Sequence, residues 1–198
     1  MPRGSRRRKK RCRGQPRSGA GRSAAATARS PDGRWTAFVK DYNVFVRPQD
    51  GPEVQLSKDG AAGNSYGMLD WAGDSKTLVA FRIEPGENKE VYLVESSPSV
   101  GARAKLRTRP YPLSGDKYTG YELNLFDVAQ QKQVKPAVER VDFGRPNLRW
   151  RKDGRRFTYE RYDRGHQRFR LIELDTHTAE ARNLIDEKAQ TFIWSAHT

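Results

Sequence analysis

A repeat of about forty residues constrains this chain more than any other feature of its sequence. Each copy has an Asp, then Gly or Ser, then a basic residue, and then a run of branched or aromatic side chains. The aligned stretches are SPDGRWTAF (30–38), WAGDSKTLVAF (71–81) and WRKDGRRFTY (150–159). The aspartates, Asp32, Asp74 and Asp153, lie 42 and 79 residues apart, which is about one and two units. Successive copies of one small structural unit are therefore expected.

The Asp-Gly or Asp-Ser pair in each copy predicts a tight turn. Asp accepts hydrogen bonds from its own downstream backbone, and Gly tolerates positive φ. A Trp before the turn and the apolar run after it then form the two strands of a hairpin. The other strand candidates alternate in polarity and are separated by turn sequences such as EPGENK (84–89). The strands expected after the turns and elsewhere are 36–40, 43–47, 53–57, 90–95, 121–125, 132–136, 156–160, 167–174 and 180–185.

Four short strands in every 40–45 residues are typical of a β-propeller blade. We predict an all-β fold, an incomplete propeller of about three blades of four-stranded antiparallel sheets. The blades are expected near 30–60, at 68–140 with a long excursion, and near 147–187, and Trp194 would open another at 191–198. An ordinary β-sandwich with coincidental Asp-Gly turns is the alternative.

The basicity of the chain belongs to its first 29 residues. The net charge is +14, but residues 1–29 carry eleven Lys and Arg and no acid, which leaves 27 basic and 24 acidic residues in 30–198. The tail lacks aromatic and branched aliphatic side chains, so it is predicted to be disordered. Its RRRKKRCR run is typical of a nuclear-localisation or nucleic-acid patch, and a merely solvated tail is the alternative. Without an aromatic residue for base stacking, nucleic-acid binding by the tail would be weak and nonspecific.

Several other classes of protein are disfavoured by the sequence. The longest apolar runs, LVAF (78–81) and VYLV (91–94), have four residues, against about 20 for a membrane span. No secretory signal is expected, because the Arg-rich start is followed only by the short SAAATA. Cys12 is the single cysteine, which excludes a disulfide framework and a cysteine-based metal site. No cofactor or metal site is predicted.

Residues 63–67 read GNSYG and match the G-x-S-x-G pattern of a serine-hydrolase elbow, with Ser65 as the candidate nucleophile. An elbow needs a hydrophobic strand before the serine and a helix after it. Here LSKDGAA precedes the motif and MLDWAGDSK follows it. His166 and His177 fall in turns and His197 at the C-terminal end, and none is positioned by an Asp in a recognisable context. We therefore predict that Ser65 is not a nucleophile and that the chain has no catalytic residue.

A series of motifs carries a family resemblance. In order they are SPDGRWTAFVKDYNVFVR, WAGDSKTLVAFR, VYLVESSP, RPYPLSGDKYTGYELNLFDV, RGHQRFRLIELD and TFIW. Together they resemble the N-terminal β-propeller of the dipeptidyl peptidase IV-like (prolyl oligopeptidase family) serine peptidases, most closely a microbial branch, over residues 30–194. The resemblance implies an eight-bladed propeller followed by an α/β-hydrolase domain that holds Ser, Asp and His. This chain would then be a fragment of the propeller.

Two motifs of that family are missing from the sequence. One is the Gly-Trp-Ser-Tyr-Gly-Gly elbow of the hydrolase domain. The other is the Glu-Glu pair that holds the free amino terminus of the substrate, and the comparable stretch here reads AAGNSYGMLD (61–70). The resemblance therefore transfers no catalytic or substrate-binding residue to this chain.

The leading hypothesis is a propeller segment of a dipeptidyl peptidase IV-like serine exopeptidase. It would take part in proteolysis through substrate access and gating, and would be inactive alone. The implied partners are a peptide substrate, the missing C-terminal hydrolase domain and, since the family is often homodimeric, a second copy; the implied location is exported or periplasmic. The alternative is a free-standing propeller-type module that binds a protein or a glycan.

A fragment of a propeller is also expected to expose apolar surface that neighbouring blades would cover. The exposed side should include the one built on Phe157, Tyr159, Phe169 and Leu171. Open strand edges favour unwanted pairing. The isolated chain is therefore expected to self-associate or to be only marginally folded.

Overall fold

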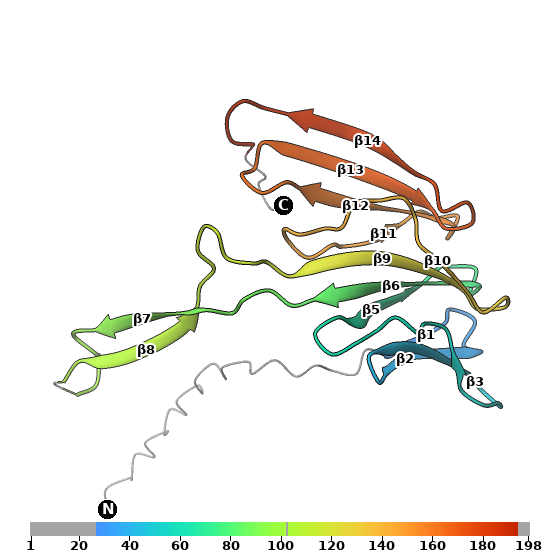
Figure 1. Ribbon diagram of the computed structural model, residues 1–198, viewed down its shortest axis with the longest axis horizontal. Coiled ribbons are helices and arrows are strands. Elements are labelled where there is room, and N and C mark those ends of the chain that lie inside the picture. The colour runs from blue at the N-terminus through green and yellow to red at the C-terminus, as the bar shows by residue number, and fades with distance from the viewer. Residues whose placement is uncertain (1–26, 102, 194–198) are drawn as a thin grey trace, which may run out of the picture.

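The computed structural model describes residues 27–101 and 103–193, and all the regular elements in these ranges are strands. They form three four-stranded sheets and one two-stranded hairpin, and every pair is antiparallel. The three sheets lie face to face in chain order, and the hairpin projects away from them (Figure 1). The predicted all-β fold with three four-stranded blades is confirmed.

The strands of the first sheet are β1 (Thr27–Arg29), β2 (Trp35–Lys40), β3 (Asn43–Pro48) and β4 (Val54–Gln55). Those of the second sheet are β5 (Ser65–Trp71), β6 (Thr77–Glu84), β9 (Gly120–Asp127) and β10 (Lys132–Val134). Those of the third sheet are β11 (Arg149–Trp150), β12 (Arg156–Tyr162), β13 (Arg168–Asp175) and β14 (Ala181–Lys188). The projecting hairpin consists of β7 (Glu90–Glu95) and β8 (Lys105–Pro110) and is inserted between β6 and β9.

The repeated Asp makes the same turn in each sheet. The Oδ1 atoms of Asp32, Asp74 and Asp153 accept hydrogen bonds from the backbone N–H two residues downstream, at 3.0, 2.9 and 3.0 Å. Each turn joins the first two strands of its sheet, as the alignment of the repeats predicts. The forty-residue period thus reflects the same hydrogen-bonded Asp turn, which occurs once in each sheet.

Successive sheets are joined through their turns and through a Trp. The Trp71 indole N–H donates to the Ala28 carbonyl oxygen at 3.0 Å, and the Trp150 indole N–H donates to Asp70 Oδ2 at 2.9 Å. Ala28 and Asp70 occupy equivalent places, each four residues before the Asp of its turn. Each Trp therefore binds the first strand of the preceding sheet at the equivalent position, through a backbone carbonyl in the first pair of sheets and through a carboxylate in the second.

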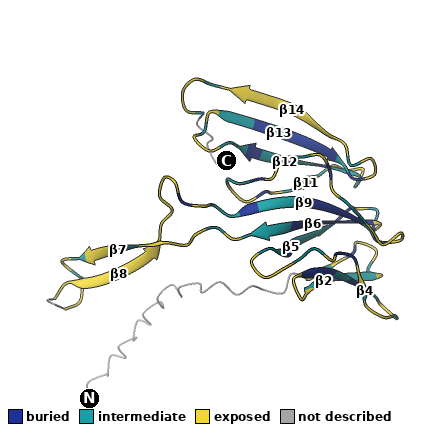
Figure 2. Ribbon diagram, viewed as in Figure 1, coloured by how far each residue is buried: buried dark blue, intermediate teal, exposed yellow. Residues whose placement is uncertain are grey.

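Two hydrophobic cores fill the spaces between the sheets. Within β6, Leu78 and Ala80 belong to the core shared with the first sheet, whereas Val79 and Phe81 belong to the core shared with the third sheet. Successive strand residues point to opposite faces, so the middle sheet needs apolar residues at every position. This explains the unbroken LVAF run. Burial is accordingly greatest along β6 and β9, while β7, β8 and β14 are largely exposed (Figure 2).

The face assignment of the third sheet differs from the prediction. Phe157 and Tyr159 are buried against the second sheet, whereas Phe169 and Leu171 lie on the opposite face and are half-buried. The register pairs Phe157 with Leu174 and Tyr159 with Ile172. Odd positions of β12 therefore share a face with even positions of β13, and the expected grouping of four residues on one exposed face is wrong.

Two strands were not expected from the sequence. β1 includes residues 27–29, which had been assigned to the disordered tail, and β8 lies within the expected excursion. β1 has three residues and β8 reads KLRTRP with every residue exposed, so neither shows the polarity alternation on which strand prediction depends. The rest of the predicted tail lies outside the described residues, as does Trp194, and residues 191–193 form no strand.

Removing residues 1–29 is expected to destabilise the chain more than removing residues 1–26. The longer deletion removes β1 and with it the acceptor of the Trp71 indole, which is 6% exposed and would be left without a partner. We expect the free energy of unfolding to differ by roughly 2 kcal/mol, the cost of an unsatisfied buried donor with its strand pairing. Urea denaturation of the two shortened chains measures the difference, and equal midpoints would mean that β1 contributes no stability.

Candidate functional site

Ser65, the serine of the GNSYG motif, begins strand β5. It pairs with Ile83 of β6, and its Oγ donates to the carbonyl oxygen of Tyr66 at 3.0 Å. The strand that it begins has seven residues and ends at Trp71, and a turn follows it in place of a helix. This is not the strand–turn–helix setting that exposes a nucleophile. The geometry thus favours the prediction that Ser65 is not catalytic.

His177 has an aspartate partner that sequence reasoning missed. Its Nε2 lies 3.1 Å from Asp74 Oδ2 across the boundary between the second and third sheets. Burial opposes ionisation of Asp74, but hydrogen bonds from the Lys76 backbone and from His177 outweigh it, so the pKa of the carboxyl is below its ordinary value. The two residues are 103 positions apart, and only the stacking of the sheets brings them together.

The His177–Asp74 pair does not form a triad with Ser65. Asp74 lies in the turn after β5, whereas Ser65 starts that strand, and seven strand residues span roughly 20 Å. His166 lies in the β12–β13 turn, where its ring packs at 5.0 Å from Phe143 and 4.6 Å from Phe192. His197 lies outside the described residues.

We expect the isolated chain to show no peptidase activity, and Ser65→Ala to leave that result unchanged. The reason is that the Ser65 hydroxyl donates to a backbone carbonyl, and no general base among the described residues is hydrogen-bonded to it. Hydrolysis of dipeptidyl chromogenic substrates by the pure chain checks this. Activity that is present in the natural sequence and lost in Ser65→Ala would overturn the assignment.

The loop before β5 is held by a polar cluster centred on Asp59, which precedes residues 61–70, the stretch comparable to the missing Glu-Glu pair. The Asp59 carboxylate accepts hydrogen bonds from the Tyr66 hydroxyl at 2.8 Å and from Lys135 Nζ at 2.9 Å. Arg82 donates from Nε to Glu122 Oε2 at 2.9 Å and reaches Asp59 Oδ2 at 3.4 Å. The Asp59 cluster (Asp59, Tyr66, Arg82, Glu122 and Lys135) thus links the loop to the second sheet.

The charged groups of the Asp59 cluster are paired with one another. Burial raises the pKa of the Tyr66 hydroxyl well above its usual range, and its hydrogen bond to Asp59 adds to this effect. Burial opposes ionisation of Asp59, but Lys135 and Tyr66 outweigh it and lower the pKa of the carboxyl. Two carboxylates face two cations, so the cluster offers no excess negative charge to hold the amino terminus of a peptide. It fixes the loop in place.

A second charged group lies between the second and third sheets. Arg161 and Arg170 face one another on β12 and β13, and both donate to Glu139 on the segment that joins the two sheets. Hydrogen bonding to Arg170 and the charge of Arg161 lower the pKa of the Glu139 carboxyl. Sequence reasoning missed this group. Alternation nevertheless places Arg161 on the same face as Tyr159, and Arg170 on the same face as Ile172, which is the face toward the second sheet.

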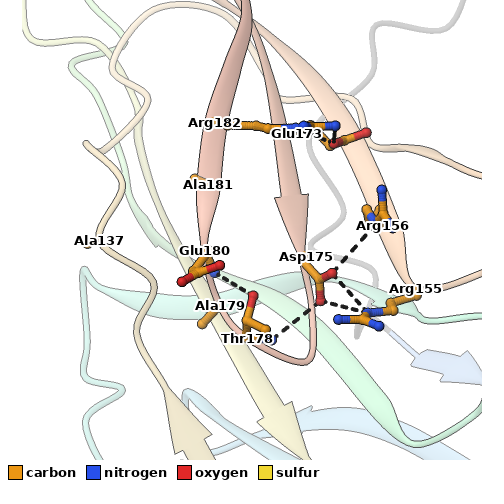
Figure 3. Close-up of a pocket in the computed structure, with 10 residues that line it drawn as sticks. All are labelled: Ala137, Arg155, Arg156, Glu173, Asp175, Thr178, Ala179, Glu180, Ala181 and Arg182. Atoms are coloured by element: carbon orange, nitrogen blue, oxygen red, sulfur yellow. Dashed lines mark hydrogen bonds and ion pairs between the residues drawn. The ribbon is translucent and has the colours of Figure 1, made fainter.

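A hollow with a volume of about 660 Å³ lies at the end of the β13–β14 hairpin (Figure 3). Its charged groups pair with one another. Arg155 Nε contacts Asp175 Oδ2 at 2.9 Å, and Arg182 Nε donates to Glu173 Oε2 at 2.7 Å. These pairs neutralise four of the charged side chains that line the hollow.

The described ranges 27–101 and 103–193 contain no group of three or more His, Cys, Asp or Glu side chains placed to hold a metal ion. Nor do they contain a helix long and apolar enough to cross a membrane.

The projecting hairpin has two chemically different faces. One face carries Tyr92, Val94 and Leu106, which are 71%, 68% and 67% exposed. The opposite face carries Arg107 and Arg109 with Val91 and Leu93. A two-stranded ribbon is marginally stable in water unless its apolar face is covered. The hairpin is therefore a candidate contact surface.

Comparison with known proteins agrees with this architecture. Residues 6–198 match the family described as the dipeptidyl peptidase IV (DPP IV) N-terminal region. Porphyromonas gingivalis dipeptidyl peptidase 4 is similar in structure, with 18% identity, a TM-score of 0.61, and coverage of 84% of this chain and 26% of that one. A protein described as a dipeptidyl aminopeptidase IV from Bacteroides ovatus is also similar, with 15% identity, a TM-score of 0.55, and coverage of 86% and 25%. This chain spans about a quarter of each of these structures, and at such identities the likeness concerns the fold.

Proposed function

Because this chain belongs to the family of dipeptidyl peptidase IV N-terminal regions, we propose that it is a propeller segment of a dipeptidyl peptidase IV-like serine exopeptidase. Its three sheets serve as successive blades. In this role the segment shapes the access of peptides to an active site on a separate α/β-hydrolase domain. The segment itself contributes no catalytic residue.

The observation that carries this proposal is that successive sheets are attached through the same two parts of the repeat. The second and third sheets both bond to their predecessors through a Trp and through the Asp turn. The outer face of the third sheet carries Phe169 and Leu171, which are only half-buried, and a shallow hollow beside Leu184. A further blade that packs there would repeat the contacts already made twice.

The proposal is tested by the coding sequence that surrounds this segment. We expect further blades and an in-frame hydrolase domain with a Gly-x-Ser-x-Gly elbow on a strand–turn–helix. The longer protein should release dipeptides from chromogenic substrates, and replacement of the serine of that elbow should abolish the activity. Five more blades followed by a stop codon would instead favour the alternative, a free-standing module that binds a protein or a glycan.

We also propose that the β7–β8 hairpin contacts a second copy of this chain. The exposed Tyr92, Val94 and Leu106 form a continuous apolar strip on a projecting ribbon, and the same strip on another copy would cover it. Isologous contacts of this kind are the commonest in soluble oligomers.

Replacing Tyr92 and Leu106 by Asp is expected to shift the chain from dimer to monomer. The charges would be buried without partners in the apolar contact, which weakens association strongly. Size-exclusion chromatography with light scattering measures the mass. The matched control is Leu93→Asp on the opposite face, which should leave the mass unchanged, whereas equal effects of both changes would place the contact elsewhere.

A further inference from the structure

We infer that Arg161 and Arg170 form a binding site for a carboxylate group, which Glu139 of the same chain fills in this structure. The two arginines are cross-strand partners on β12 and β13. Their side chains are only 9% and 7% exposed, so both guanidinium groups are buried beside each other. Buried like charges in contact are unfavourable unless anions neutralise them. The arrangement therefore requires neighbouring anions.

Glu139 supplies one such anion from outside the sheet. Its Oε2 atom lies 2.6 Å from an Nη atom of Arg161 and 3.1 Å from an Nη atom of Arg170. Asp163 contributes a second negative charge, with Oδ1 at 2.5 Å from Arg170. One carboxylate oxygen shared by two guanidinium groups is strong, charge-assisted recognition.

The site keeps unused donors. The Nε atoms of Arg161 and Arg170 are buried and have no hydrogen-bond partner among the described residues, although Arg161 Nε lies 3.7 Å from Asp163 Oδ1. Buried donors of this kind are rarely left unsatisfied in native proteins. Glu139 engages the site through Oε2 alone, whereas a ligand free to orient both of its oxygens could also reach these donors.

Glu139 is placed so that it can be replaced. Its side chain is 66% exposed although it is bonded to two buried groups. Its backbone is held nearby, because Val141 is buried and Val138 packs on the core of the second and third sheets. The side chain can therefore rotate into solvent without moving the segment, which would open the guanidinium pair to an incoming carboxylate.

The ligand class is a carboxylate on a peptide, either the C-terminal group or an acidic side chain. The peptide part of this assignment rests on the proposed function, whereas the carboxylate part rests on the arginine pair alone. A peptide carboxylate bound here would be oriented by two guanidinium groups fixed on adjacent strands, so the site would select for its position and charge.

The first test opens the site with Glu139→Ala and measures melting temperature in sodium acetate and in sodium chloride of equal ionic strength. In chloride we expect melting on the order of 10 °C below the natural chain, because a buried charge is left unpaired. Acetate should restore most of this loss in a saturable way. The matched control is Glu53→Ala, which removes an exposed carboxylate paired with Lys40 and should respond equally to both salts. Identical melting of Glu139→Ala in acetate and chloride would overturn the inference.

The second test uses the natural chain, so it stands even if Glu139→Ala fails to fold. Acetyl-Ala-Ala is added as the free acid or as the amide, and acetyl-Glu-Ala amide supplies a side-chain carboxylate. The side-chain Nε–H signals of Arg161 and Arg170, assigned with the two Arg→Lys variants, should shift with carboxylate-bearing peptides and not with the alanyl amide. The free acid and the glutamyl amide separate the two sources of the carboxylate.

If no peptide moves these signals, the pair serves only Glu139 and the inference is wrong. If they respond but the coding sequence lacks a hydrolase domain, the carboxylate site stands and the proposed function fails. The two ideas can therefore fail separately.

Discussion

Phe157→Ala is expected to lower the free energy of unfolding by about 3–5 kcal/mol, a large part of the total stability of a typical domain. Phe157 is fully buried in the core between the second and third sheets. Its ring packs edge-on against Trp150 at a centroid distance of 5.0 Å. Truncation removes this contact and leaves a cavity that the rigid sheets on both sides cannot close.

The matched control is Phe169→Ala in the same sheet. Phe169 lies on the outer face and is half-buried, so its truncation is expected to cost roughly 1 kcal/mol. Urea denaturation followed by circular dichroism measures both variants. Equal losses would mean that the inner and outer faces of the third sheet are equally buried in solution, as they would be if self-association covered the outer face.

Gly154→Ala is expected to be the second most damaging change, at roughly 3 kcal/mol or more, because two effects combine. Gly154 has a φ of +64°, in the left-handed region, and a Cβ atom there would lie 2.8 Å from the Cα atom of Gly73. The two turns meet at this point, where the Gly73 N–H donates to the Gly154 carbonyl oxygen at 3.0 Å. A methyl group would push the second and third sheets apart at their turns.

Substitutions of two other glycines separate the cost of the positive φ from the cost of the close approach between the turns. Gly63 has a φ of +76° and open space at the Cβ position, so Gly63→Ala measures the conformational cost alone, about 1–2 kcal/mol. Gly73 has no positive φ but its Cβ would lie 2.9 Å from Gly154, so Gly73→Ala measures the close approach alone. Thermal melts of the three variants should rank Gly154→Ala as the least stable. A Gly154→Ala variant no worse than Gly63→Ala would show that the turns are apart in solution.

The turns of this fold and the strands beside them could be predicted from the sequence. The turns at Asp32, Asp74 and Asp153 depend on hydrogen bonds within two residues, so their signal is contained in the motif itself. The same holds for the strands on either side and hence for the repeat. The family assignment rests on the order of these local motifs.

The relations between strands were harder to predict. Alternation shows that Phe157 and Tyr159 share a face of the sheet. Which residues of β13 lie on that same face depends on the length of the turn between β12 and β13. That turn pairs Tyr159 with Ile172. The His177–Asp74 contact and the arginine pair with Glu139 depend on the stacking of whole sheets. Nothing near these residues in the sequence encodes that stacking.

The hairpin inserted into the second sheet has a consequence for the order in which the chain folds. β2 and β3 are separated by Asp41 and Tyr42 only, whereas residues 85–119 lie between β6 and β9. Closing the longer loop costs roughly 2 kcal/mol more in chain entropy before any pairing compensates for it. The second sheet supplies a wall to both hydrophobic cores, so it is expected to form late and to limit the rate of folding. A shorter connection between β6 and β9 would then speed folding while leaving the two hydrophobic cores in place, since no described residue of 85–119 belongs to either.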